Sequence, residues 1–231
     1  MTAALVERLR AEGGRRYHDR HPFHRLMHAG RLGRRELQEW VRNRYYYQTR
    51  LPVKDALIVA KSDDPAFRRV WLGRIRGQDG DRDGEGGLAL WLRLAEGVGL
   101  DRDEVARGDG VLPGVRFACD AYVDLVRRGT LVEAVASSLT ELFAPDLMAA
   151  RIAAWERHYP WVDAEALAYF RGRVPRARAD GEHALAWVLA HASSPADEDA
   201  CVAALVRKAD ILWHLLDCVQ AAWVDRPAPE R

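Results

Sequence analysis

The spacing of the apolar residues is the feature that most limits what this chain can fold into. Apolar side chains recur three and four positions apart in segment after segment, which is the period of a helix with one buried face. Alternating β-branched runs are few, and no Asn-Gly pair marks a tight hairpin. The sequence therefore predicts an all-α protein.

Eleven helical segments follow from this periodicity and its interruptions. We expect them at Ala3–Glu12, His21–Ala29, Arg34–Thr49, Val53–Lys61, Pro65–Arg76, Leu88–Val98, Gly114–Arg128, Leu131–Phe143, Asp146–Glu156, Ala164–His191 and Ala196–Trp223. About seven of them should form the core of one compact bundle, and the rest should be short.

The interruptions have identifiable causes. Pro52 is expected to end or kink the helix that begins at Arg34, and Pro175 should kink a later one. Asp64 and Asp163 are expected to cap the helices that follow them. The glycine-rich stretch from 77 to 87 is predicted to be a flexible, acidic lid loop.

The length and charge of the chain indicate a single domain that binds neither nucleic acid nor membrane. The 231 residues show no linker, so one domain over 1–231 is predicted, with 1–16 and 224–231 peripheral. Lys plus Arg number 35 against 34 acidic residues, a balance that does not attract nucleic acid. No long apolar run or signal peptide is seen, and the three cysteines form no CxxC pair. The cytoplasm is the expected location.

Cations occupy positions where a helical core should be apolar. Leu37, Trp40 and Val41 define one face of a predicted helix, and that face continues to Arg44 and Gln48. A buried arginine without a partner is costly, so something anionic should meet it. The alternatives are a structural ion pair or an arginine whose head reaches solvent.

The same conflict recurs on four other predicted helices. The residues concerned are Arg74, Arg151, Arg173 and Lys208. One cation on an apolar face is usually structural. Five such cations on five predicted helices suggest a shared interior pocket lined with positive charge. Arginine donates in a planar, bidentate fashion that suits carboxylates. The sequence therefore predicts a ligand that carries several carboxylates or phosphates.

Metal-binding patterns are incomplete. His18, His21, His24 and His28 form a cluster in which His21–His24 and His24–His28 have metal-ligand spacing, but no HExxH or ExxH accompanies them. Asp180–His183 could supply half of a di-iron set, whose second half is missing. We expect no metal, and a helical di-iron oxygenase is the alternative. No nucleophile elbow or dinucleotide-binding fingerprint is present either.

Several long motifs resemble the pyrroloquinoline-quinone synthase family. They run in order from about Tyr17 to about Trp223 and read HPFHRLMHAG, LQEWVRNRYYYQTRLPVKDALI, WLRLAEGVGL, VLPGVRFACDAY, SSLTELFAP, HYPW and KADILWHLLD. The resemblance implies a haem-oxygenase-like helical bundle without haem, assembled as a homodimer. It also implies ring closure and eight-electron oxidation of a bicyclic tricarboxylate precursor to pyrroloquinoline quinone. Dioxygen is then the co-substrate, hydrogen peroxide is released, and no cofactor is required.

The resemblance also implies the site residues. The catalytic candidates are His18, Tyr122, Tyr169 and Arg173. The expected substrate-binding residues are Tyr17, Arg44, Gln48, Lys54, Arg74, Gln78, Glu141, Met148, Arg151 and Lys208.

Two positions depart from the family pattern. Gln78 and Met148 stand where the family has histidines that are candidates for acid–base and oxygen chemistry. Glutamine hydrogen-bonds but does not titrate near neutrality, and methionine does neither usefully. His18 is then the surviving base. The alternatives are a homologue that binds the quinone or its precursor without full turnover, and an oxidase of another polycarboxylate.

Overall fold

The structure is a computed structural model that describes residues 2–225, and all regular elements in that range are helical. Its α-helices are α1 (Thr2–Arg16), α2 (Pro22–His28), α3 (Arg34–Ala60), α4 (Pro65–Asp79), α5 (Gly86–Gly97), α6 (Arg102–Arg107), α7 (Pro113–Arg128), α8 (Leu131–Ser137), α9 (Ala144–His158), α10 (Ala168–His191) and α11 (Pro195–Trp223). Short 3₁₀ helices are η1 (His18–Arg20), η2 (Ser138–Phe143) and η3 (Ala164–Leu167). The predicted all-α class is confirmed.

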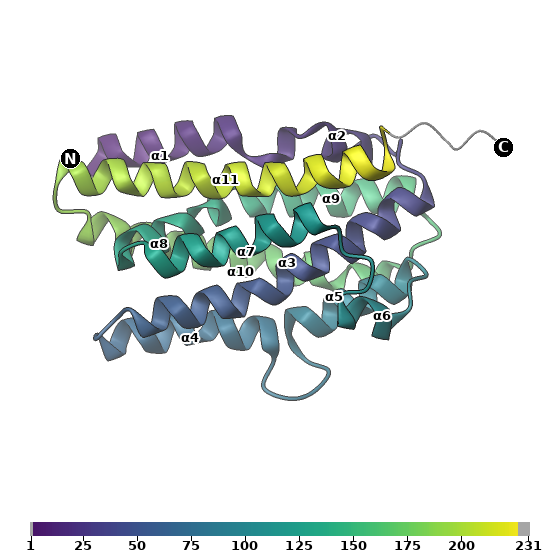
Figure 1. The fold of residues 1–231 in the computed structure, drawn as a ribbon, viewed down its shortest axis with the longest axis horizontal. Helices are drawn as coiled ribbons and strands as arrows, with labels where there is room; N and C mark the ends of the chain where they lie inside the picture. Colours follow the sequence, from purple (N-terminus) through teal and green to yellow (C-terminus); the bar gives the residue numbers. More distant parts are fainter. Residues whose placement is uncertain (1, 226–231) are drawn as a thin grey trace.

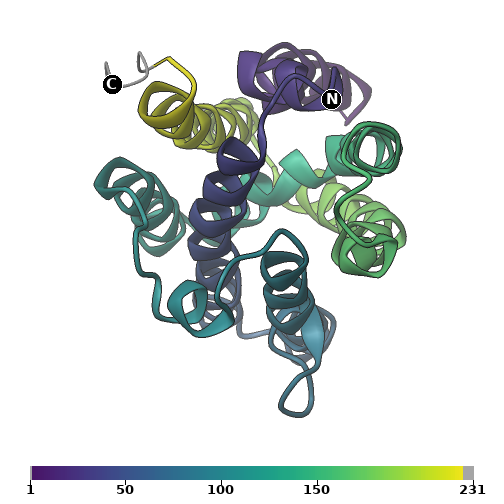
Figure 2. The same cartoon turned by 90° about the vertical axis from the view of Figure 1, so that its right-hand side faces the viewer.

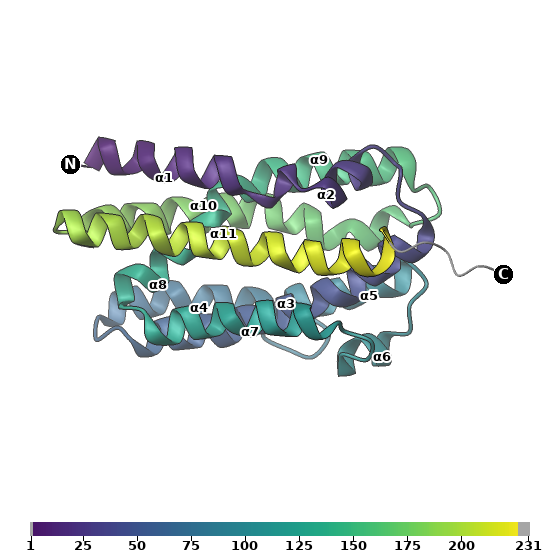
Figure 3. The same cartoon turned by 45° about the horizontal axis from the view of Figure 1, so that its top comes forward.

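Helix α3 runs through the middle of the bundle, where the end-on view shows the other long helices around it (Figure 2). It packs against α4, α5, α7 and α11. Helix α11 lies alongside α1 in both side views (Figures 1 and 3), and α9 packs against α10. A side chain on the inner face of α3 therefore meets residues from both ends of the chain.

Aromatic rings fill the centre of this arrangement. Trp40 on α3 is fully buried, with its ring centroid 5.6 Å from Trp91, 6.0 Å from Trp155 and 6.4 Å from Phe170. Large rings packed in tilted and edge contacts bury much apolar area and hold fixed positions. They form a rigid wall beside the polar residues that follow Trp40 along α3.

The two internal prolines do not end their helices. Helix α3 continues through Pro52, so the two segments predicted on either side of that residue are one helix. Helix α10 likewise continues through Pro175. A proline at position 52 cannot donate to the carbonyl of Gln48, and that carbonyl instead accepts a hydrogen bond from the Gln78 side chain at 3.3 Å. A partner from α4 thus replaces the lost backbone bond.

The predicted lid loop from 77 to 87 is shorter than expected. Helix α4 continues to Asp79 and α5 begins at Gly86, which leaves a turn over residues 80–85. Gly80, Gly84 and Gly86 adopt positive φ angles of 83°, 83° and 79°, which ordinary side chains avoid. Gln78 therefore lies on a helix and is buried.

The predicted helix caps are confirmed at one helix but not at another, and one short helix was missed. Asp64 accepts from the amides of Ala66 and Phe67, as predicted, whereas the side chain of Asp163 makes no capping bond. Helix α6 was not predicted. It is capped by Asp101 and ends at Gly108 with a φ of 76°, and its six residues are too few to show a period.

Helix α1, in the segment 1–16 that was predicted to be peripheral, packs against the bundle. Leu5 and Leu9 of α1 are buried, and α1 contacts α11. Most of the segment from 224 to 231, predicted to be peripheral, lies outside the described residues. Among residues 2–225, no helix combines the length and apolar character needed to cross a bilayer.

Candidate active site

A central cavity of about 50 Å³ lies beside α3 and gathers nine of the fourteen predicted site residues. These nine are Tyr17, His18, Arg44, Gln48, Glu141, Met148, Arg151, Tyr169 and Arg173. They come from η1 and the residue before it, α3, η2, α9 and α10. The remaining lining is largely apolar or aromatic and includes Tyr47, Leu51, Trp91 and Leu212.

The other five predicted residues lie next to this cavity but do not line it. Arg74 and Gln78 line an outer cavity of about 410 Å³, which shares Leu51, Glu141 and Arg173 with the central one. A buried layer behind Tyr47 holds the remaining three, Lys54, Tyr122 and Lys208. The structure thus brings all fourteen into one region.

Three of the site cations have acidic partners. Lys54 Nζ lies 2.6 Å from an Asp55 carboxylate oxygen. Glu141 lies between two arginines, 3.2 Å from Arg173 and 3.7 Å from Arg74. Arg74 and Arg173 thus form the kind of structural ion pair that the sequence left open for its misplaced cations, whereas Lys54 was expected only from the family resemblance.

Arg44, Arg151 and Lys208 are different, because no carboxylate among residues 2–225 pairs with any of them. All three are buried. The Arg44 guanidinium lies 4.0 Å from the Tyr47 ring centroid. Lys208 Nζ donates to Tyr47 Oη at 2.8 Å and lies 3.6 Å from the Tyr122 ring centroid.

The pKa values of these cations reflect their isolation. Burial lowers the pKa of Arg151 to about 9, and the charge of Arg44 acts in the same direction. Burial, followed by the charge of Arg44, also lowers the pKa of Lys208 well below its ordinary 10.5. Buried charges of one sign without partners are unfavourable unless a ligand neutralises them. The site is therefore built to receive an anion.

Two carboxylates lie beside Arg74 and Arg173, where the two cavities meet. Glu141 and Asp180 both face Arg74 and Arg173, with Asp180 oxygens 3.8 Å and 3.5 Å from the two arginines. Burial raises the pKa of Glu141, but Arg173 and Arg74 outweigh it and the net direction is downward. The pKa of Asp180 is raised by burial and then by Glu141. Glu141 is thus the carboxylate that stays ionised.

Tyr169 is held by the amide side chain of Gln48, which is held in turn by that of Gln78. Its hydroxyl donates to Gln48 Oε1 at 2.8 Å, and Gln78 Nε2 donates to the same oxygen at 3.1 Å. Burial raises the pKa of Tyr169, so it stays a neutral hydrogen-bond donor. Gly87 makes room for this arrangement, because a Cβ there would lie 2.5 Å from Gln78 Oε1.

Two histidines extend the site towards α2. His24 Nε2 lies 3.1 Å from Arg151 Nη2, and His24 Nδ1 lies 2.8 Å from the His18 carbonyl. Since guanidinium only donates, His24 Nε2 is the acceptor and its proton is on Nδ1. His24 is therefore neutral, and it holds Arg151 without cancelling its charge. Burial, then Arg44, lowers the pKa of His18 well below 6.5, so this candidate base is also neutral.

Because these histidines are buried in their neutral form, we predict that the folded protein loses stability in acid. Burial also lowers the pKa of His24 well below 6.5, and that of His28 to about 4. The unfolded chain then binds more protons, so the stabilisation is present above pH 6.5 and is lost as the pH falls towards 4. Because His24→Gln keeps the polar contacts but cannot titrate, we expect it to flatten this loss by up to about 1.4 kcal/mol per pH unit. Urea unfolding across this range measures it, and an unchanged slope would contradict the assignment.

Metal-ligand geometry is absent from the part of the chain that the structure describes. No three His, Cys, Asp or Glu side chains gather there closely enough to hold a metal ion. Asp180, weighed from the sequence together with His183 as half of a di-iron set, pairs with Arg74 and Arg173.

Sequence reasoning gave no substrate-binding or catalytic role to three residues that contact the site, and it weighed Asp180 only as a metal ligand. Asp180 follows Arg173 by seven positions, two helical turns along one face of α10. Tyr47 follows Arg44 by three, also on one face. His24 was considered only as a metal ligand. Helical spacing was a usable signal for the first two, whereas the contact between His24 and Arg151 joins segments far apart in the chain.

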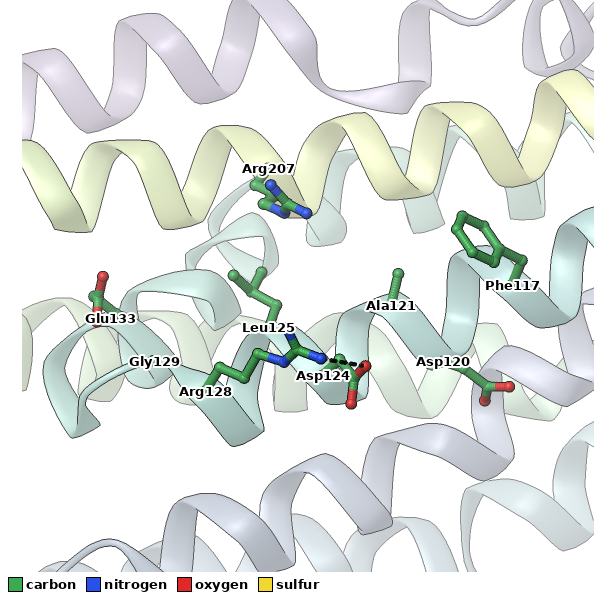
Figure 4. Close-up of a pocket in the computed structure, with 9 residues that line it drawn as sticks. All are labelled: Phe117, Asp120, Ala121, Asp124, Leu125, Arg128, Gly129, Glu133 and Arg207. Atoms are coloured by element: carbon green, nitrogen blue, oxygen red, sulfur yellow. Dashed lines mark ion pairs between the residues drawn. The ribbon is translucent and has the colours of Figure 1, made fainter.

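A larger hollow of about 640 Å³ lies on the outside of the bundle and shares no residue with the central cavity. Figure 4 shows it along α7, with Arg207 of α11 on its far side. Phe117 at one end is 74% exposed. Its polar residues are spread along an open groove, so we do not assign it to the chemistry.

This chain matches one protein family and is similar to named proteins over most of its length. The profile of the TENA/THI-4/PQQC family matches residues 6–217. The pyrroloquinoline-quinone synthase of Acidiphilium cryptum is 48% identical over 220 residues, covering 95% of this chain and 89% of that protein. That of Rhizobium rhizogenes is 50% identical over 221 residues, covering 96% and 90%.

Solved structures share the fold at low sequence identity. A domain of unknown function with a haem-oxygenase-like fold from Shewanella denitrificans superposes with a TM-score of 0.79 at 14% identity, covering 99% of this chain and 98% of that one. A TenA homologue from Pseudomonas syringae gives a TM-score of 0.79 at 12% identity, covering 94% and 93%. The expected haem-oxygenase-like architecture is confirmed.

Proposed function

This chain belongs to the TENA/THI-4/PQQC family, and from that premise we propose that it is a pyrroloquinoline-quinone synthase. It takes part in pyrroloquinoline-quinone biosynthesis by closing the last ring of a bicyclic tricarboxylate precursor and oxidising it by eight electrons. Dioxygen accepts the electrons and hydrogen peroxide leaves. The proposal includes no metal or organic cofactor.

The observation that carries this proposal is the group of three buried cations without acidic partners. Arg44 of α3 and Arg151 of α9 line the cavity, and Lys208 of α11 lies behind Tyr47, to which it donates a hydrogen bond. A substrate with three carboxylates offers the matching charge, and charge-assisted hydrogen bonds from arginine are among the strongest in proteins. The same cations would stabilise an electron-rich substrate anion and the reduced oxygen species formed from it.

The substrate requires more room than the central cavity provides. Sites for molecules of this size usually enclose about 300–1,000 Å³, whereas the central cavity holds about 50 Å³ and the outer one about 410 Å³. Glu141 and Arg173 line both, so their ion pair lies on the boundary. We propose that substrate carboxylates replace Glu141 as partners of Arg173 and Arg74. Displacing Glu141 from this boundary would join the two cavities.

A direct test starts with anaerobic binding of the precursor to purified protein. Air is then admitted while absorbance and oxygen uptake are recorded. The quinone spectrum with oxygen consumption and peroxide is expected. Tight binding without oxygen uptake would instead indicate the non-oxidising homologue that Gln78 and Met148 leave open. No binding would indicate an oxidase of another polycarboxylate.

His18 is proposed as the base that removes substrate protons. It lines the cavity and is neutral, so it can accept a proton. Its low pKa makes it a weak base, and we expect His18→Ala to slow turnover by about tenfold or more. Steady-state oxygen uptake measures this. His21→Ala is the matched control, because His21 is a neighbouring buried histidine outside the cavity that pairs with Asp217. A loss of less than twofold in His18→Ala would remove the assignment.

Assembly and location are also proposals. A homodimer follows from the family resemblance, and the exposed Phe117 groove on α7 is a surface that a second copy could cover. Sedimentation of wild type and Phe117→Ser would test this. Cytoplasmic location is supported by three free thiols at Cys119, Cys201 and Cys218, as expected in a reducing compartment.

A further inference from the structure

Met148 places a thioether inside the candidate active site. It lies on α9, one turn before Arg151, whose Nη1 is 3.6 Å from its sulfur. Met148 also lines the central cavity together with Tyr169 and Arg173. The chain contains three methionines. Met1 lies outside the described residues, and Met27 is fully buried and does not line the cavity.

We propose that Met148 is a self-modification site, where peroxide formed during turnover converts the thioether to a sulfoxide. This inference rests on the proposed function, which supplies the peroxide. The sulfur attacks one oxygen of hydrogen peroxide, an S–O bond forms and the O–O bond breaks. Sulfur loses two electrons, and the departing hydroxide takes the second proton and leaves as water.

The geometry favours Met148 over a methionine that meets peroxide from solution. Peroxide is formed within the same cavity, so its effective concentration at the sulfur far exceeds that in bulk. Arg44 and Arg151, which line the cavity without acidic partners, can donate hydrogen bonds to hydrogen peroxide and retain it there. Methionine, unlike histidine at this position, is readily oxidised by peroxide.

The modification has a consequence for activity. A sulfoxide oxygen is a much stronger acceptor than a thioether sulfur, and Arg151 Nη1 is already directed at this sulfur at 3.6 Å. Arg151 would then bind the sulfoxide in competition with a substrate carboxylate. Activity should therefore decline with the number of turnovers completed.

The test is peptide mass spectrometry after aerobic turnover, with catalase present to remove peroxide that escapes. Oxygen uptake is recorded in the same reaction. We expect Met148 sulfoxide to rise with product and to exceed Met27 sulfoxide by about tenfold or more. Oxygen uptake with Met148 unmodified, or equal oxidation of both methionines, would overturn the inference alone. Absence of oxygen uptake would overturn the proposed function and this inference with it.

A second measurement follows the decline in rate. Each protein is compared with its own initial rate, since Met148→Leu changes a cavity residue. Wild type should lose rate as sulfoxide accumulates, and Met148→Leu should hold its initial rate over the same number of turnovers. Equal declines would show that sulfoxide formation does not limit activity and would overturn the expected competition for Arg151.

Discussion

Arg151→Met is expected to make the folded protein more stable and the enzyme much worse at binding its substrate. The guanidinium is buried without a carboxylate partner, and burial has already lowered its pKa to about 9. Replacing such a charge with an apolar side chain of similar length removes a desolvation cost. The hydrogen bond to His24 is lost, which offsets part of the gain. We expect a net rise of about 1 kcal/mol in the free energy of unfolding.

Affinity should change in the opposite direction. If Arg151 is reserved for a carboxylate of the ligand, its removal leaves that carboxylate buried without a partner. This costs about 2–5 kcal/mol, so binding should weaken by about a hundredfold. Urea unfolding and calorimetric titration with pyrroloquinoline quinone measure the two quantities on the same protein.

Arg173→Met is the matched control for that experiment. Arg173 lines the same cavity, but it pairs with Glu141 at 3.2 Å. Its removal leaves Glu141 buried with Arg74 as its remaining arginine partner at 3.7 Å, so we expect a loss of stability of about 2–3 kcal/mol. Affinity should fall in both variants. If Arg151→Met destabilised the protein as much as Arg173→Met does, the distinction between cations without a carboxylate partner and cations paired with one would be wrong.

Helical periodicity predicted most of the fold, and tertiary contacts account for the errors. Helix α3 continues through Pro52, and the Gln48 carbonyl that this proline leaves without a backbone donor accepts from Gln78, thirty residues away. The local pattern around Pro52 cannot contain that information. The loop predicted from 77 onward failed for a related reason, since burial of Gln78 against α3 favours one more turn of α4.

The candidate site was predictable as a set of residues but not as a set of pairs. Cations on apolar stripes pointed to Arg44, Arg74, Arg151, Arg173 and Lys208, and the structure brings them into one region. Which of them are neutralised depends on carboxylates from other segments. Glu141 on η2 pairs with arginines on α4 and α10, and no spacing rule links these elements. The cations without acidic partners, on which the proposed function rests, could be identified only from the structure.

Gln78 and Met148 are the two site positions that differ from the family pattern. Gln78→His combined with Met148→His is expected to raise the rate of substrate oxidation by about a hundredfold, the low end for acid–base catalysis. Met148 lines the cavity, and Gln78 contacts Gln48, which bonds to Tyr169. An imidazole at 78 could still donate to Gln48 and could also carry a proton. Burial among cations would keep both imidazoles neutral, which limits the gain.

The controls separate proton transfer from hydrogen bonding. Met148→Asn introduces a side chain shaped like part of an imidazole while Gln78 is kept, so both positions then hold amides that cannot titrate. Single-turnover oxidation of bound precursor, started by admitting air, isolates the chemical step from binding. A rate increase in the double histidine variant but not in Met148→Asn would show that proton transfer limits the native chain. Equal increases would assign the effect to hydrogen bonding. If neither variant were faster, the native chain would already have its full complement of proton-transfer groups, and His18 and Tyr169 would be sufficient.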